Sequence, residues 1–125
     1  MENKVSVVVT CYNHEEYIEG CWRSIFKQTY KNIELLVFDD GSTDDSGQII
    51  EKVLKDSPFL GETYYFSSKT RGVISVRNVA LSKIPGEFLL FVDSDNFIAL
   101  EHIEWLHNSL TQAGAVITYC QLWDL

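Results

Sequence analysis

The chain has 125 residues, of which 46% are hydrophobic and 22% are charged, a balance typical of one soluble globular domain. Its net charge of −8 argues against a nucleic-acid-binding protein, which would normally present a basic face. No apolar run approaches the roughly 20 residues that a membrane-spanning helix needs, and the N-terminus lacks a signal-peptide layout, so we expect a cytoplasmic location.

The first part of the chain alternates short apolar runs with an amphipathic segment. Val5–Thr10 and Ile33–Phe38 are apolar and too short for helices, so we predict two buried strands. Between them, apolar residues recur at helical spacing across residues 17–26. Asn13, followed three residues later by Glu16, predicts a capping box for this helix.

An acidic turn follows the second predicted strand and leads to a second predicted helix. Gly41 supplies a permissive backbone for the turn. Ser42 or Thr43 is expected to cap the helix, whose apolar positions fall between residues 49 and 54.

The second half continues the same alternation. It predicts a strand at 62–68, a helix at about 76–84, a strand at 88–95, a helix from about 100 to 114, and a fifth strand at 115–123. Strands that are continuously apolar and alternate with helices indicate a parallel sheet covered on both faces. We therefore predict one α/β domain, a three-layer α/β/α sandwich with a mainly parallel, Rossmann-like sheet.

Polar and acidic side chains follow three of the predicted strands. Ligands of open α/β sheets bind beyond the carboxyl ends of the strands, so Thr10–Asn13, Asp39–Asp40 and Asp93–Asp95 are expected to share one rim. The last segment is a DxD motif, and its hard oxygens suit Mg²⁺ or Mn²⁺ together with substrate phosphates. The alternative is a pair of solvated loop aspartates.

Other residues near this rim are candidates for ligand contacts. One of Asp39 and Asp40 is expected to accept hydrogen bonds from turn amides, and the other from a ligand N–H. Tyr12 can stack on a flat ring, or it is a loop tyrosine packed on the surface. The nearest cations in the chain, either phosphate ligands or solvated charges, are Lys69, Arg71 and Arg77.

The histidines and cysteines show no pattern of a metal site. His14, His102 and His107 lack metal-ligand spacing, so we interpret them as surface or helix residues. Three cysteines without a CxxC pair indicate buried free thiols, and they argue against a disulfide scaffold or a zinc site.

Four segments together resemble family 2 glycosyltransferases of the GT-A fold, in the family's order and spacing. They are VSVVVTCYNHEEYI, SIFKQTYKNIELLVFDDGSTDDS, RGVISVRNVAL and GEFLLFVDSDN, and the resemblance extends from about Val5 to about Leu106. It implies transfer of a sugar from a nucleotide sugar, often UDP-linked, with inversion at the anomeric carbon and with help from Mn²⁺ or Mg²⁺. The implied acceptor is a carbohydrate or a lipid-linked molecule, and a location at the inner face of the membrane stays open.

The resemblance implies roles for residues on the nucleoside side. Thr10 and Tyr12 match the family's TYN-type loop, in which the tyrosine packs on the base. Asp40 matches the acidic residue that accepts a hydrogen bond from the uracil ring nitrogen. Cys11 departs from the family's pattern, which often has a proline before this loop.

The resemblance also implies roles on the phosphate side. Arg77 matches the arginine of the family's ARN segment, near the donor phosphates, and Asp93 matches the first DxD aspartate, near the ribose. Asp95 matches the last DxD aspartate, which binds the metal that bridges the diphosphate. Arg71 replaces a glycine of the family's pattern, which adds a cation to the phosphate pocket or only alters the loop.

The length of the chain is the larger departure. In the family, the acceptor site and the catalytic base follow the first half of the sheet, often on an acidic ED segment that residues 1–125 lack. We therefore expect these residues to form a nucleotide-sugar-binding portion that binds the donor and transfers sugar poorly or not at all. The alternatives are a non-catalytic nucleotide- or sugar-binding module and a phospho-receiver-like domain. A dinucleotide oxidoreductase is disfavoured because no GxGxxG follows the first strand.

Overall fold

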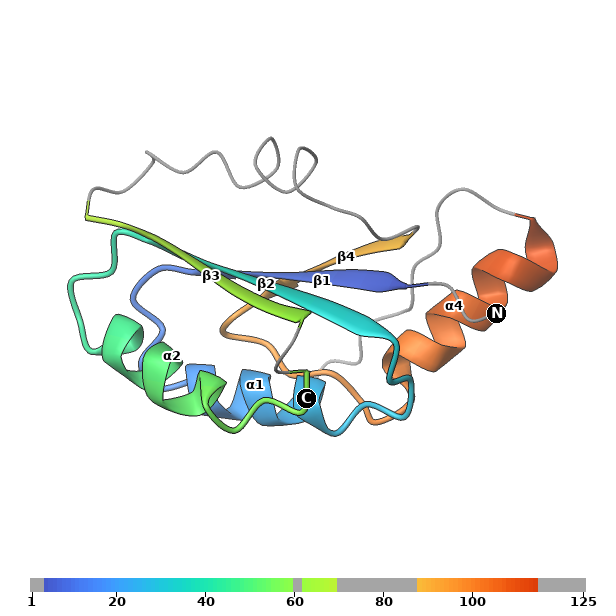
Figure 1. Cartoon of the computed structure of the whole chain (residues 1–125), viewed down its shortest axis with the longest axis horizontal. Helices are drawn as coiled ribbons and strands as arrows, with labels where there is room; N and C mark the ends of the chain where they lie inside the picture. Colours follow the sequence, from blue (N-terminus) through green and yellow to red (C-terminus); the bar gives the residue numbers. More distant parts are fainter. Residues whose placement is uncertain (1–3, 60–61, 70–87, 115–125) are drawn as a thin grey trace.

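The computed structural model describes residues 4–59, 62–69 and 88–114, which form a four-stranded sheet with helices (Figure 1). The elements run β1 (Val5–Cys11), α1 (Ile18–Phe26), β2 (Ile33–Asp40), α2 (Ser46–Leu54), β3 (Thr63–Ser68), β4 (Phe88–Asp93) and α4 (His102–Ala113). The strand order is β3-β2-β1-β4, and every neighbouring pair is parallel. The predicted α/β class with a parallel, Rossmann-like sheet is confirmed.

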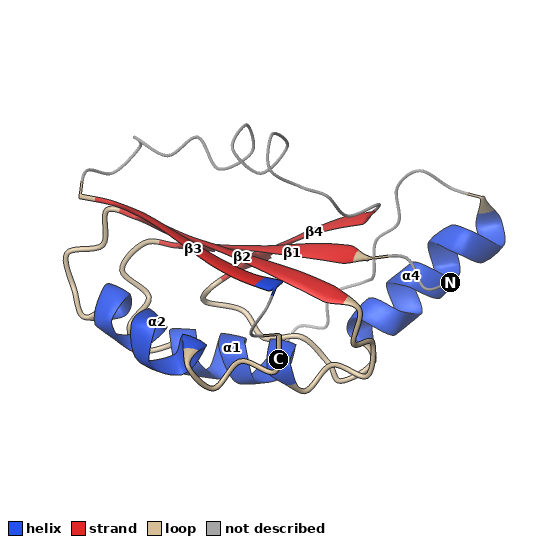
Figure 2. Ribbon diagram, viewed as in Figure 1, coloured by secondary structure: helices blue, strands red, loops and turns tan. Residues whose placement is uncertain are grey.

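Two predicted elements lie outside the described residues, the helix at about 76–84 and the strand at 115–123. Helices α1 and α2 cover one face of the sheet (Figure 2). Within the part of the chain that the structure describes, no helix is long and apolar enough to cross a membrane.

The main core lies between the sheet and helices α1 and α2. The central strands β1 and β2 are buried on both faces for nearly their whole length, which explains why their sequences are continuously apolar instead of alternating. The side chains that point toward the helices meet the apolar faces of α1 and α2, and those with no exposed surface include Val7, Val9, Leu35, Val37, Ile18, Trp22, Ile25 and Ile50.

Helix α4 packs at the opposite end of the sheet from the carboxyl ends of the strands. The His107 ring lies 5.2 Å from the Phe88 ring at the start of β4 and 4.9 Å from the Tyr30 ring just before β2. Gly114 ends the helix in the left-handed conformation, with φ of 62°, as its position after the last apolar residue predicts.

A buried glutamine connects the end of α1 to the segment between β4 and α4. Gln28 has no exposed surface. Its side-chain amide donates to the carbonyl oxygens of Ala99, at 2.6 Å, and Ser24, at 3.1 Å, while its Oε1 accepts from the Ile103 N–H at 3.0 Å. The segment that follows the DxD motif is therefore anchored to α1.

We expect Gln28→Leu to lower the free energy of unfolding by about 3 kcal/mol, because leucine leaves the buried Ile103 N–H and Ala99 carbonyl without partners. Urea denaturation followed by circular dichroism measures the change. Lys27→Ala, at the exposed neighbouring position, is the control and should stay within about 0.5 kcal/mol of the parent. Equal stability of Gln28→Leu and the parent would contradict the anchoring role.

Candidate functional site

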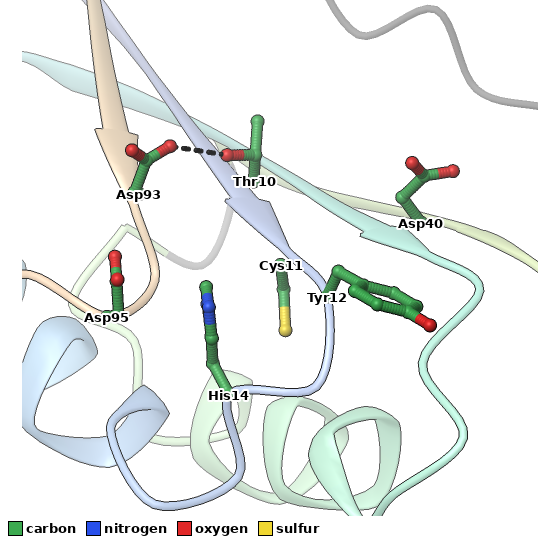
Figure 3. A pocket seen from close by; sticks show the side chains of 7 residues that line it. All are labelled: Thr10, Cys11, Tyr12, His14, Asp40, Asp93 and Asp95. Atoms are coloured by element: carbon green, nitrogen blue, oxygen red, sulfur yellow. Dashed lines mark hydrogen bonds between the residues drawn. The ribbon is translucent and has the colours of Figure 1, made fainter. Parts of the chain in front are cut away.

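A pocket lies at the carboxyl ends of β1, β2 and β4 (Figure 3). The parallel register pairs Thr10 with Asp93 and Cys11 with Asp39, so polar residues that are far apart in the sequence end at the same edge. The residues that line the pocket are Thr10, Cys11, Tyr12, His14, Asp40, Asp93 and Asp95. Five of the six residues predicted for the site are thus brought together, and the sixth, Arg77, lies outside the described residues.

Thr10 and Asp93 are joined across the β1–β4 pair. The Thr10 hydroxyl donates to Asp93 Oδ1 at 2.9 Å, which the dashed line in Figure 3 marks. The Ser94 N–H donates to the Thr10 carbonyl oxygen at 3.0 Å, so the backbone just beyond β4 is held as well. These two bonds fix the direction of the Asp93 carboxylate at the edge of the pocket.

The two neighbouring aspartates at the end of β2 are in different environments. Asp39 is buried, and its Oδ1 accepts from the Ser42 N–H at 3.2 Å, which is the turn-amide contact expected for one member of the pair. Its Oδ2 faces the start of α2, since a Cβ on Gly47 would lie only 3.1 Å from that atom. Asp40 is partly exposed and lines the pocket. Adjacent residues of a strand face opposite sides, which separates the two carboxylates.

The loop after β1 is held by Asn13, and the predicted capping box is wrong. Helix α1 begins at Ile18 without a side-chain cap. The Asn13 Oδ1 instead accepts from the N–H groups of Thr43, at 2.8 Å, and Asp44, at 3.3 Å. Asn13 itself has a φ of 52°, in the left-handed region that asparagine tolerates better than most residues. The side chain therefore binds the neighbouring loop and not its own helix.

The predicted caps of the second helix are also wrong. Helix α2 begins at Ser46, and the Ser46 N–H donates to Asp44 Oδ1 at 2.9 Å, not to a side chain of Ser42 or Thr43. The Ser42 hydroxyl accepts from the Asn13 N–H at 3.0 Å instead. The predicted caps fail because the loops after β1 and β2 lie side by side. The polar side chains of each loop therefore form hydrogen bonds with the other loop.

The sequence indicates only a surface or helix residue at His14, and the structure places this residue in the lining of the pocket (Figure 3). Its Nδ1 makes a hydrogen bond with the hydroxyl of Ser94, the fully buried residue between the two DxD aspartates. The backbone N–H of His14 donates to the Ser46 hydroxyl at 3.0 Å. The only signal in the sequence was its place two residues after Tyr12, on the loop that reaches the rim.

A buried thiol lies beneath the DxD motif. The pKa of Cys21 is raised to about 12, mainly by burial and to a lesser extent by the negative charge of Asp95, by the nearby Cys11 and by Asp93. The Cys21 Sγ lies 3.8 Å from the Asp93 carbonyl oxygen, to which it can donate. Cys11 and Cys21 are both free and buried, as predicted.

The acidic residues of the pocket suit a hard divalent cation only in part. Among the described residues, no three His, Cys, Asp or Glu side chains are arranged to hold a metal ion. Asp93 and Asp95 can supply one or two carboxylate ligands, and a bound phosphate and water would have to supply the others. Mg²⁺ commonly binds in this manner, with one or two carboxylates and substrate phosphates.

The comparison with known sequences identifies the family. A sequence model of glycosyl transferase family 2 matches residues 6–124, and the chain belongs to this family. It is 37% identical over 117 residues to glycosyltransferase GlyA of Streptococcus pneumoniae, an alignment that covers 94% of the chain and 16% of GlyA.

Solved structures of glycosyltransferases share the fold. TarS of S. aureus, residues 1–349 in complex with UDP, superposes with a TM-score of 0.74 at 36% identity, covering 87% of this chain and 32% of that one. The mannosyltransferase PcManGT from Pyrobaculum calidifontis, in complex with GDP-Man and Mn²⁺, gives 0.69 at 26% identity, covering 78% and 29%. The expected GT-A fold is confirmed, and the chain spans a third or less of the length of these proteins.

We expect Asn13→Ala to lower the free energy of unfolding by about 2 kcal/mol. Alanine removes the acceptor of two backbone N–H groups and is strained at positive φ. Asn13→Asp keeps an Oδ1 acceptor and tolerates this conformation, so it should lose less than about 1 kcal/mol. Urea denaturation of the three proteins measures the difference. Identical losses in both variants would show that the side-chain oxygen does not hold the loops together.

The raised pKa of Cys21 predicts a pH dependence of stability. The folded state keeps the thiol proton, so this contribution is complete below an unfolded-state pKa of about 8.5 and is lost as the pH rises toward 12. Between pH 8 and pH 10, the parent should lose about 1–2 kcal/mol more unfolding free energy than Cys21→Ala. Urea denaturation at both pH values tests this, and parallel pH profiles would refute it.

Proposed function

We propose that this pocket binds the nucleoside diphosphate of a sugar donor, preferably a UDP-sugar, and that residues 1–125 form the donor-binding portion of an inverting glycosyltransferase. The observation that carries the proposal is the convergence of Tyr12 and Asp40 with Asp93 and Asp95 in one pocket at the carboxyl ends of three strands. Related structures support the ligand class, since TarS is described in complex with UDP and with UDP-GlcNAc.

The nucleoside is proposed to bind at the side of the pocket that Tyr12 and Asp40 form. In Figure 3 the two side chains lie together, on the opposite side from Asp93 and Asp95. The tyrosine ring offers a flat apolar surface for the base, and the ionised Asp40 can accept a hydrogen bond from a ring N–H. Uracil has such an N–H. Guanine has one too, so the preference for UDP rests on the family resemblance and on the greater identity to TarS than to PcManGT.

The ribose and the diphosphate are proposed to extend from there toward the DxD motif. The hydrogen bond from Thr10 orients Asp93, which is placed to accept from a ribose hydroxyl. Asp95 is the proposed ligand of Mn²⁺ or Mg²⁺, and PcManGT with bound Mn²⁺ supports the use of a divalent ion. A cation bound there would neutralise the charge that develops on the leaving diphosphate. Arg77 remains a candidate for the phosphates.

The reaction that this arrangement supports is a single displacement at the anomeric carbon. An acceptor hydroxyl of a carbohydrate or lipid-linked molecule attacks the carbon while the diphosphate leaves. No residue of the pocket is assigned as the base that takes the hydroxyl proton, because the resemblance places that residue C-terminal to the donor-binding portion. The contribution of the described residues is therefore to bind the donor and to hold its leaving group.

Calorimetric titration with UDP, with Mn²⁺ and with EDTA, tests the donor site. We expect binding that is tighter with Mn²⁺, and we expect Asp95→Asn to lose about tenfold or more of the affinity in Mn²⁺, because an amide is a poorer ligand for a hard cation than a carboxylate. Asp56→Asn, which removes an exposed carboxylate outside the pocket, is the matched control and should bind as the parent does.

Each result of this titration has a distinct meaning. No binding at millimolar UDP by a folded chain would overturn the proposed donor site. Equal affinity with Mn²⁺ and EDTA would overturn the metal assignment and leave the nucleotide assignment standing. Equal losses in Asp95→Asn and Asp56→Asn would show a general effect of charge and not a metal ligand.

A further inference from the structure

The charges of the pocket present a problem for an anionic ligand. Three carboxylates line it, those of Asp40, Asp93 and Asp95. Among the described residues that line the pocket, His14 is the only side chain that can carry a positive charge or donate a ring N–H. A diphosphate that binds at this rim needs hydrogen-bond donors as well as a cation. The imidazole of His14 is placed where it can supply such a donor.

The backbone of His14 is fixed from three sides. Its N–H donates to the Ser46 hydroxyl at the start of α2. Its carbonyl oxygen accepts from the N–H groups of Tyr17, at 2.9 Å, and Ile18, at 3.0 Å, at the start of α1. The preceding residue, Asn13, is bound to the loop after β2. The imidazole therefore projects from a loop that is anchored to both helices of the core.

The ring of His14 is fixed as well. Nδ1 is bound to the Ser94 hydroxyl, and the Tyr17 ring packs against the imidazole edge-on with centroids 6.3 Å apart. When the Ser94 hydroxyl donates to Nδ1, the neutral ring carries its proton on Nε2. The cationic ring also has a proton there. In both states Nε2 is a donor that the bond to Ser94 does not use.

The direction of the ring completes the geometry. Figure 3 shows the His14 side chain rising into the pocket between Asp95 on one side and Cys11 and Tyr12 on the other. If the base lies at Tyr12 and Asp40 and the metal at Asp95, the diphosphate crosses the space between them. His14 lies along that path.

We propose that His14 is a diphosphate-binding residue, with Nε2–H donating to a phosphate oxygen of the donor while Ser94 holds Nδ1. This inference rests on the proposed donor function. It adds a residue that neither the sequence pattern nor the family resemblance assigned. The same bond couples the ligand to the DxD motif, because Ser94 lies between Asp93 and Asp95.

Two substitutions at His14 separate the two ring nitrogens. His14→Asn places an amide near the position of Nδ1, where it can still meet Ser94, and it removes the donor at Nε2. His14→Gln reaches further and places an amide donor near the position of Nε2. The control is His102→Asn, which makes the same substitution at a histidine of α4 that does not line the pocket. NMR titrations with UDP and with uridine, both in the diamagnetic ion Mg²⁺, compare the four proteins.

We expect His14→Asn to bind UDP about ten- to a hundredfold more weakly than the parent, the range for a hydrogen bond to a charged group. Uridine has no phosphate, so its affinity should change less than about twofold, which also shows that the variant is folded. His14→Gln should recover part of the UDP affinity, and His102→Asn should match the parent.

Several results would overturn the inference. These are unchanged UDP affinity in His14→Asn, or an equal loss of affinity for uridine. A third is weaker binding of Mn²⁺ alone by His14→Asn in a calorimetric titration, which would make His14 a metal ligand and not a phosphate donor. If the parent binds uridine and UDP equally, no phosphate contact exists and the inference falls. If the parent binds neither, the proposed donor function itself is removed.

Discussion

The parallel pairing of β1 with β2 and β4 is the constraint on which the candidate site depends. All strands of a parallel sheet end at the same edge, and the register pairs Thr10 with Asp93 and Cys11 with Asp39. Strands β1 and β2 are buried on both faces over most of their length, so ionised groups are tolerated mainly where these strands end. The sheet thus stabilises the fold through its apolar middle and gathers carboxylates at one end, where water or a ligand can reach them.

The loops of the site are held to one another by long-range hydrogen bonds. Asn13 joins the loops after β1 and β2, His14 joins the first loop to the DxD segment, and Gln28 anchors the chain beyond that segment to α1. Each of these three hydrogen bonds joins residues that are at least 30 positions apart in the sequence. Such bonds order the loops before a ligand arrives, which reduces the conformational entropy that binding must remove.

The fold could be predicted because its signals are local, and part of the site could be predicted for the same reason. Continuous apolar runs identify the parallel strands, of which β1 and β2 are buried as predicted while β4 is mostly half-buried or exposed. The rule that ligands bind at the carboxyl ends then places Asp93 and Asp40 at one rim. The roles of Asn13 and His14 are not predictable from the sequence, because their partners lie in other loops, about 30 and 80 residues away, where no local pattern indicates them. The sequence does allow one to predict that Asp39 is buried and that Asp40 faces the pocket. Asp39 lies on the same face of the strand as Leu35 and Val37, which point to the helices.

The acidity of the rim also bears on how ligands of the proposed kind would bind together. Asp40, Asp93 and Asp95 attract a cation and repel a diphosphate, so a metal and a nucleotide would each bind better in the presence of the other, and the gain is the same in both directions. An imidazole held beside Asp95 reduces the repulsion for the phosphates without competing for the carboxylate, because its bond to the protein goes to Ser94. Under this arrangement the serine of the DxD motif is more than a spacer, since it links the group that receives the phosphates to the carboxylates on either side of it.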